Sequence, residues 1–318
     1  MRIAFFGSGE FGIECLTAVE SSSHDLVLLV TTPPCPAGRG RKLNPTAIAK
    51  WARSNSITLL EAWQINAPDT IQQVADCHPD LNLVIACGQK ISRRLVDLPP
   101  KGSINVHASL LPKYRGAAPI NWAIINGEQE TGISIITLAD KMDAGKIIAQ
   151  SKTQIAPDET AGSLHDKLAR LAAPLLLETL DKIDEGIAIY SEQDHSKATL
   201  APKLSKSDGY IDFNEPAEIL ERKIRGFWPW PGTSANYVSK ETNKSLRVTF
   251  AQAKVVEHQN PSRLAPGTLD ENLNIICAEN ALRIIKIKPS GSGLMDFKSF
   301  VNGRNTKPGD SFAKINSF

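Results

Sequence analysis

Length, composition and charge limit the classes of protein to which this chain can belong. It has 318 residues, 42% of them hydrophobic and 22% charged, with a formal net charge of +2; these values predict an ordinary globular protein with two domains, and we expect a monomer. No apolar stretch reaches membrane-span length, and residues 1–6 form a strand-length apolar run rather than a signal peptide, so we expect a cytoplasmic protein with no membrane partner.

Charge and cysteine usage both differ along the chain. Residues 1–199 hold 19 Lys and Arg against 22 Asp and Glu, whereas residues 200–318 hold 17 against 12, so the net charge changes from −3 to +5. A basic second half indicates an anionic partner, although a well-solvated surface explains the charges equally well. The five cysteines are scattered and lack the spacing of a zinc or redox motif, so we expect free thiols: Cys15, Cys35, Cys77, Cys87 and Cys277.

A glycine-rich turn follows the first predicted strand, residues 3–6. Its sequence, Gly7-Ser8-Gly9-Glu10-Phe11-Gly12, matches the dinucleotide-binding fingerprint. That fingerprint also needs an acidic residue at the end of the second strand, residues 26–30, and the sequence there continues with two threonines and two prolines. We therefore expect the glycines to let the first helix pack close to the sheet, and a dinucleotide-dependent oxidoreductase remains a remote alternative.

The loop after the second strand, residues 33–45, is basic. It carries Arg39, Arg41 and Lys42 among prolines and glycines. Taken alone, these side chains fit a solvated surface loop. Because the loop follows a parallel strand, it lies at the sheet edge where ligands bind, and cations there suit nucleic-acid phosphates.

Short apolar runs alternate with helical stretches through the first half of the chain. This alternation predicts an α/β fold with a doubly wound, mostly parallel, Rossmann-like sheet. The runs are residues 3–6, 26–30, 81–86, 104–106 and 133–138.

Asn105 and His107 lie on one of these predicted strands, two residues apart, so their side chains share a face. An amide donor and an imidazole suit the attack of an amine on a carbonyl, which requires oxyanion stabilisation and removal of a proton. Asp143, in a second strand-to-loop stretch, is a carboxylate that can fix the imidazole tautomer. An Asn-x-His strand alone is usually only a polar face. Here a loop rich in helix and strand breakers, residues 109–119, follows at the edge where α/β sheets bind ligands.

The rest of the chain predicts a long helix, a linker and a second domain. Residues 146–155 resemble a hairpin strand, and residues 161–185 have leucines at helical spacing. We place the first domain at 1–189, a polar linker at 190–206 and the second domain at 207–318.

The second domain begins with a helix at residues 214–226, where Asn214 is the expected cap before Pro216. Short strands at residues 245–256, 273–278 and 282–287 then predict a small β-barrel.

Several motifs occur in a fixed order along nearly the whole chain, and together they resemble the 10-formyltetrahydrofolate-dependent formyltransferase superfamily. The most specific are residues 105–119 and Met142-Asp143-Ala144-Gly145. The resemblance implies that the second domain is an OB-like barrel. Supporting matches are residues 36–43, 130–132, 203–206, 224–227 and 228–231.

The resemblance also implies a reaction: transfer of the formyl group of 10-formyltetrahydrofolate to the α-amino group of methionyl initiator tRNA, with no metal required. Asn105, His107 and Asp143 match the residues that carry the chemistry. Arg39 matches a residue that enters the tRNA acceptor arm, with Arg41 and Lys42 as supporting phosphate contacts. The residues that match the tetrahydrofolate site are Ser109, Leu110, Leu111 and Pro112.

Three alternatives share parts of this pattern. Glycinamide ribonucleotide formyltransferases are typically single-domain proteins, so the basic second domain argues against them. Sugar-nucleotide N-formyltransferases keep the fold and the three residues, and only the Arg39 loop and the region around Trp228 separate them from the favoured function. A tRNA-binding protein without activity would not need Asn105, His107 and Asp143 together.

Overall fold

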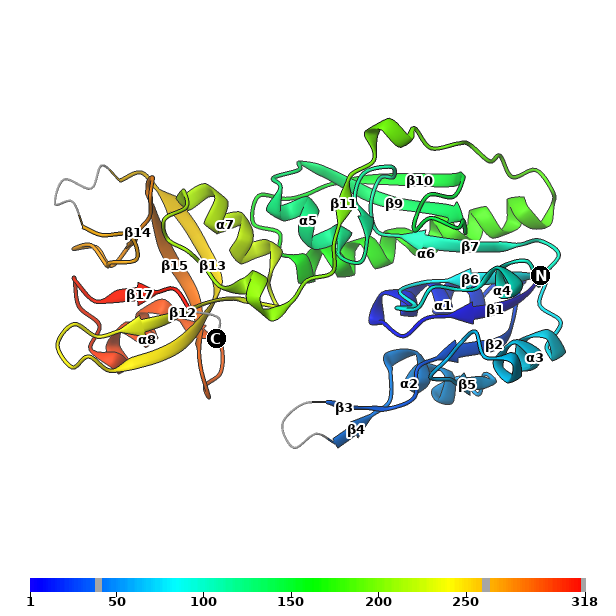
Figure 1. Ribbon diagram of the computed structural model, residues 1–318, viewed down its shortest axis with the longest axis horizontal. Helices are drawn as coiled ribbons and strands as arrows, with labels where there is room; N and C mark the ends of the chain where they lie inside the picture. The colour runs from blue at the N-terminus through cyan, green and yellow to red at the C-terminus, as the bar shows by residue number, and fades with distance from the viewer. Residues whose placement is uncertain (38–41, 259–263, 316–318) are drawn as a thin grey trace. The chain divides into compact units, whose positions relative to one another are not determined.

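The computed structural model describes residues 1–37, 42–258 and 264–315 (Figure 1). The chain divides into two compact units. Unit 1 comprises residues 1–119, 130–154 and 165–202, and unit 2 comprises residues 120–129, 155–164 and 203–318. Arg39 and Arg41 lie outside the described residues.

Unit 1 is built on a seven-stranded sheet. Its five strands from β5 to β7 are parallel, and β9 and β10 extend it with antiparallel pairing. This confirms the predicted mostly parallel sheet. In spatial order the strands are β10 (Ile147–Gln154), β9 (Glu130–Thr137), β7 (Ser103–His107), β6 (Leu81–Val84), β1 (Arg2–Phe6), β2 (Asp25–Thr31) and β5 (Leu59–Glu61).

Helices and two small sheets accompany these strands. The long helix α6 covers nearly the predicted range, and Leu164, Leu168 and Leu176 on its apolar stripe are buried. The helices of unit 1 are α1 (Ile13–Glu20), α2 (Ala47–Ser54), α3 (Pro68–Asp76), α4 (Arg93–Val96) and most of α6 (Ala161–Asp184), whereas α5 (Pro119–Ile125) belongs almost wholly to unit 2. The two-stranded sheets pair β3 (Cys35–Ala37) with β4 (Lys42–Asn44), and β8 (Arg115–Gly116) with β11 (Leu200–Ala201).

The glycine-rich turn after β1 serves close packing. A Cβ atom on Gly7 would overlap the carbonyl oxygen of Ile85, and one on Gly12 would lie 3.0 Å from the ring of Phe5. The 3-10 helix η1 (Glu10–Gly12) then leads directly into α1. The glycines therefore let backbone and ring pack where a side chain would not fit.

Unit 2 contains an antiparallel, barrel-like sheet that confirms the predicted second architecture. Its core is rich in aromatic side chains. The ring of Tyr237 meets that of Phe300 edge-on and is tilted against that of Phe312. The strands follow the order β14 (Ile275–Ile276), β15 (Ala281–Pro289), β13 (Ser245–Val256), β12 (Thr233–Val238) and β17 (Ser311–Ala313), with β16 (Met295–Asp296) beside β15. The helices are α7 (Ala217–Gly226), α8 (Phe297–Arg304) and the 3-10 turn η3 (Lys206–Gly209).

The start of α7 differs from the sequence prediction. Pro216 occupies the N-cap position and no side chain caps the helix, whereas Asn214 donates instead to the carboxylate of Asp212 at 2.8 Å. The backbone N–H of Asn214 also donates to Asp212 Oδ1 at 3.1 Å, so Asp212 forms an Asx-type turn where the cap was expected.

Residues 190–201, here called the return segment, follow α6 and contain the short 3-10 helix η2 (His195–Lys197) and β11. β11 pairs in parallel with β8, and Ser191 exchanges two backbone hydrogen bonds of 2.8 Å with Ile147 at the start of β10. The return segment is therefore hydrogen-bonded at two places in unit 1, to β8 and to the start of β10. No helix in the described part of the chain is long and apolar enough to cross a membrane.

Candidate active site

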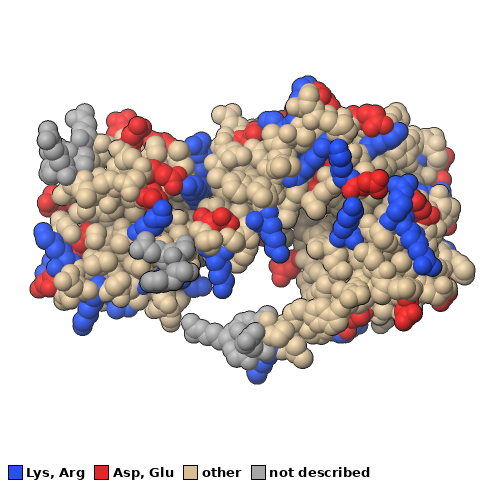
Figure 2. All heavy atoms as spheres, in the orientation of Figure 1, with Lys and Arg blue, Asp and Glu red and all other residues tan. Residues whose placement is uncertain are grey.

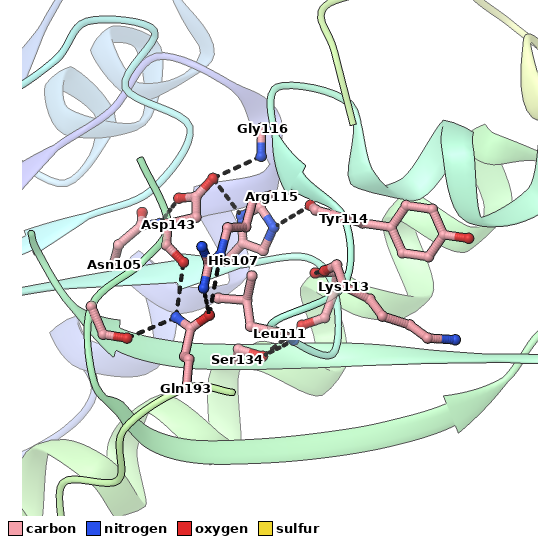
Figure 3. Close-up of polar contacts among 12 residues, drawn as sticks. Asn105, His107, Leu111, Lys113, Tyr114, Arg115, Gly116, Ser134, Asp143 and Gln193 are labelled. Carbon is pink, nitrogen blue, oxygen red and sulfur yellow. Dashed lines mark hydrogen bonds and ion pairs between the residues drawn. The ribbon is translucent and has the colours of Figure 1, made fainter. Parts of the chain in front are cut away.

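Strand β7 carries two of the three predicted site residues. It lies between β6 and β9, and its register sets Asn105 beside Val84 and His107 beside Ser134. Asn105 and His107 are two residues apart on this strand, and both side chains reach Asp143 in the loop after β9 (Figure 3). The structure thus brings together the three residues that the sequence analysis selected.

His107 is nearly buried, with 6% of its surface exposed. Its Nε2 lies 2.9 Å from the carbonyl oxygen of Tyr114. Because a carbonyl only accepts, Nε2 carries the hydrogen, and Nδ1 faces the Asp143 carboxylate at 3.7 Å. The Tyr114 carbonyl therefore holds a hydrogen on Nε2 and leaves Nδ1 directed at Asp143.

The Asp143 carboxylate receives hydrogen bonds from two directions. Oδ1 accepts from the Asn105 amide at 3.4 Å, and Oδ2 accepts from the backbone N–H of Gly116 at 2.9 Å. Its side chain is 12% exposed. The carboxylate is therefore held between β7 and the loop that follows it, with Oδ2 also facing His107.

Local geometry explains the Met-Asp-x-Gly spacing. Asp143 has a φ of +52°, in the left-handed region that few side chains adopt. A Cβ atom on Gly145 would overlap the carbonyl oxygen of Thr137 at the end of β9. Glycine at this position lets the loop turn tightly enough to direct Asp143 toward β7.

A cavity of about 150 Å³ opens beside these residues, and Asn105 and Asp143 form part of its wall. His107 is not among the lining residues and lies behind Asp143. Most of the wall is apolar. The other lining residues are Val84, Lys90, Ile91, Ile136, Thr137, Leu138, Ala139, Asp140 and Met142.

A second cavity, of about 370 Å³, shares part of this wall, including Lys90, Ile91 and Leu138. The sequence analysis did not select these residues, nor Asp140, which lines both cavities. Lys90 and Ile91 follow the carboxyl end of β6. Ligands bind beyond the carboxyl ends of parallel strands, so this position in the sequence could have identified both residues.

The predicted tetrahydrofolate residues lie in the loop between β7 and β8. Ser109 and Leu111 are buried, and Leu110 and Pro112 are half-buried. The Ser109 hydroxyl donates to the Lys113 carbonyl at 2.7 Å, and Leu111 N–H donates to the Ser134 hydroxyl at 3.0 Å. None of the four lines the cavity beside Asn105. Their observed contacts order the loop.

Of the three basic residues in the loop after β2, the structure describes Lys42. It begins β4, in a β3–β4 hairpin that forms a sheet of its own, and is exposed. In the described ranges 1–37, 42–258 and 264–315, no three His, Cys, Asp or Glu side chains are grouped as metal ligands.

Two protein-family models match successive parts of the chain. The model described as Formyl transferase matches residues 1–180, and the one described as Formyl transferase, C-terminal domain matches residues 203–305. Fold and site therefore define a formyl-transferring enzyme.

Curated relatives extend the match over nearly the whole chain. A methionyl-tRNA formyltransferase of Caldanaerobacter subterraneus is 39% identical, with 97% of this chain and 99% of the relative covered. Proteins of the same name from Agathobacter rectalis (36%; 98% and 99% covered) and Akkermansia muciniphila (39%; 95% and 96% covered) are similar. The chain belongs to the methionyl-tRNA formyltransferase family.

Solved structures share the fold at low identity. The sugar 3N-formyl transferase WlaRD has a TM-score of 0.61 at 15% identity and covers 100% of this chain and 99% of its own. HypX from Aquifex aeolicus, solved with tetrahydrofolic acid, has a TM-score of 0.62 at 15% identity, with 100% of this chain and 51% of HypX covered. These likenesses show the fold alone.

Proposed function

We propose that this protein transfers the formyl group of 10-formyltetrahydrofolate to the α-amino group of methionine esterified to initiator tRNA. The observation that carries the proposal is the placement of Asn105 and Asp143 on a cavity wall, with His107 in contact behind them. Relatives of this name that match end to end support the choice of acceptor.

In the proposed mechanism, Asn105 stabilises the developing oxyanion. The amine nitrogen attacks the formyl carbon, and the carbonyl oxygen gains negative charge as the centre becomes tetrahedral. One N–H of the Asn105 amide bonds Asp143 at 3.4 Å. The amide has a second N–H, which can donate to the formyl oxygen.

The proton released by the amine passes to the Asp143–His107 pair. Asp143 lines the cavity, whereas His107 is buried with its Nδ1 toward Asp143 Oδ2. Collapse of the tetrahedral centre breaks the bond from carbon to N10 of the folate, and the pair returns the proton to that nitrogen. The products are formylmethionyl-tRNA and tetrahydrofolate, and no metal is needed to balance the reaction.

The donor is proposed to bind in the cavity beside Asn105. Apolar side chains such as Ile91, Ile136 and Leu138 suit a flat pterin ring, and polar backbone groups at the strand ends can fix its orientation. In this proposal residues Ser109, Leu110, Leu111 and Pro112 support the site by ordering the loop that follows Asn105 and His107.

The tRNA is proposed to contact the basic loop with Arg39, Arg41 and Lys42 and the basic second half of the chain, whose net charge is +5. We also propose that the enzyme acts as a monomer in the cytoplasm, and that its domains divide at 1–189, 190–206 and 207–318.

The decisive experiment compares three acceptors with labelled 10-formyltetrahydrofolate: methionyl initiator tRNA, glycinamide ribonucleotide and a UDP-amino-sugar. We expect transfer to the tRNA alone. Transfer to a small amine alone would keep the chemistry but refute the acceptor. Lack of transfer to all three would refute the proposed function.

A further inference from the structure

Gln193 is a buried residue of the return segment that the reaction scheme above does not use. Its side-chain N–H groups donate to the backbone carbonyls of Asp143 at 2.8 Å and Gly145 at 2.7 Å. Its carbonyl oxygen accepts from Nη2 of Arg115 at 2.6 Å and from Nε at 3.2 Å (Figure 3). Only 5% of Gln193 is exposed, so these bonds form away from solvent.

These contacts use the complete hydrogen-bonding capacity of the amide, which has two N–H groups and two lone pairs. Each donor bonds one carbonyl of the Asp143 loop, on either side of Ala144. The carbonyl of Asp143 belongs to a residue whose φ is +52°, a conformation that needs support from its surroundings. Gln193 supplies that support through its two hydrogen bonds to the loop backbone.

The carbonyl oxygen of Gln193 bonds Arg115, which lies in the second loop that holds the Asp143 carboxylate. Arg115 directly precedes Gly116, whose N–H donates to Asp143 Oδ2 at 2.9 Å. The return segment binds this loop again at Thr199, whose carbonyl accepts from Arg115 N–H at 2.9 Å and whose hydroxyl accepts from Tyr114 N–H at 2.9 Å. One glutamine side chain therefore joins both loops that meet at the Asp143 carboxylate.

We propose that Gln193 is a positioning residue for formyl transfer: it fixes the Asp143 carboxylate against Asn105 and His107 without touching substrate. The inference rests on the proposed function. It assigns the return segment, which composition alone indicates is a polar linker, a direct part in building the site.

The first test replaces Gln193 with Met, which has similar length but makes none of the four hydrogen bonds. We expect kcat to fall about 10- to 100-fold, the scale associated with misplacing a reacting group by about 1 Å. KM for the folate and for tRNA should stay within about threefold, because Gln193 contacts neither proposed site. Glu192→Gln is the matched control, because the side chain of the neighbouring Glu192 is 72% exposed and forms an ion pair with Lys146 at the surface.

A double-mutant cycle separates positioning from general destabilisation. If Gln193 acts through Asp143, Gln193→Met should reduce kcat less than about threefold further once Asp143→Asn is present, because coupled residues are not additive. If Gln193 had a purely structural role, the fold-loss of kcat in the double variant would be the product of the two single fold-losses. Equal fold-losses in both backgrounds, or a kcat of Gln193→Met within threefold of wild type, would overturn the proposal.

Gln193→Glu is the second variant in case Gln193→Met does not fold. It keeps an acceptor for Arg115 but directs a carboxylate oxygen at the carbonyls of Asp143 and Gly145, so we expect at least the same loss of kcat. Wild-type kcat in the folded Glu variant would refute the role. Failure of the proposed function itself is distinguishable, because wild-type protein would then form no formylmethionyl-tRNA at all.

Discussion

The Asp143 carboxylate is the point at which separate parts of unit 1 meet. The carboxylate accepts hydrogen bonds from Asn105 on β7 and from Gly116 in the following loop. The backbone carbonyl of Asp143 accepts a hydrogen bond from Gln193. His107 completes the group with Nδ1 toward Oδ2. A carboxylate in such surroundings has little freedom to rotate, which favours a fixed geometry at the reacting atoms.

Substitution of the two titratable residues tests this arrangement. We expect His107→Ala and Asp143→Asn each to lower kcat by about 100-fold or more, the usual scale for loss of acid–base or oxyanion help. Single-turnover formyl transfer to methionyl-tRNA measures the effect. Asp97→Asn, an exposed carboxylate that pairs with Arg93, serves as control. Turnover within a few fold of wild type in either variant would contradict the assigned roles.

Gly145 offers a test of the backbone rather than of a functional group. Gly145→Ala forces a Cβ against the Thr137 carbonyl, so we expect lower stability, by about 1–3 kcal/mol as for other overpacked sites, together with reduced kcat. Gly303→Ala in α8, where a Cβ meets nothing within 4 Å, should instead be neutral or stabilising. Urea unfolding of both variants provides the comparison, and equal stability of the two would show that the loop adapts to the added methyl group.

The clustering of Asn105, His107 and Asp143 was predictable because each signal is local. Asn105 and His107 follow from strand alternation, and Asp143 follows from a short motif with glycine at a fixed distance. Gln193 could not be found this way, because it lies 50 residues from Asp143 and its surroundings are polar. The position of the hydrogen on His107 depends on the backbone carbonyl of Tyr114. Every residue has such a carbonyl, so no side-chain pattern in the sequence predicts this contact.

At the scale of elements, burial decided which strands were predictable. β1, β2, β6, β7 and β9 are almost wholly buried and therefore apolar in sequence. β12 was not predicted, since Thr233, Ser234 and Ala235 are buried despite being small or polar. β8 and β11 were also missed, because a two-residue ladder is formed by the backbone and leaves no pattern in the side chains.

The β3–β4 hairpin and its connection form the element on which tRNA recognition can be tested. We expect Arg39→Ala to raise KM for methionyl-tRNA about 10-fold or to lower kcat/KM correspondingly, as for loss of a phosphate contact of about 1–2 kcal/mol, with folate affinity unchanged. The salt dependence of kcat/KM should also become less steep. Equal loss of folate affinity would mean that the loop has a structural role in unit 1. Arg53→Ala, a cation already paired with Glu61, is a suitable control.

At the scale of the whole molecule, each unit holds a buried thiol that reports on its stability. Burial raises the pKa of Cys15 in α1 to about 12 and, in unit 2, that of Cys277 to about 12. Neighbouring Glu14 and Glu218 add to the respective shifts. Because only the thiolate reacts with alkylating agents, both residues should be inert while their units are folded.

Alkylation followed by peptide mass spectrometry tests this prediction. At pH 8 the exposed Cys35 should react first, and Cys15 and Cys277 should react only when urea opens unit 1 or unit 2. Their midpoints will coincide if the units unfold together and differ if they unfold separately. Reaction of Cys15 as fast as Cys35 without urea would contradict the closed packing around α1.

The pairing of β8 with β11 has a consequence for synthesis on the ribosome. Chains emerge from the N-terminus and begin folding before they are complete. Asn105, His107 and Asp143 are made early, but the partners of their loops, Gln193 and the β11 residue Ala201, are added much later. A nascent chain ending before residue 193 thus holds every reacting group without the hydrogen bonds that align them, and the catalytic centre is completed only when residues 193–201 have been added.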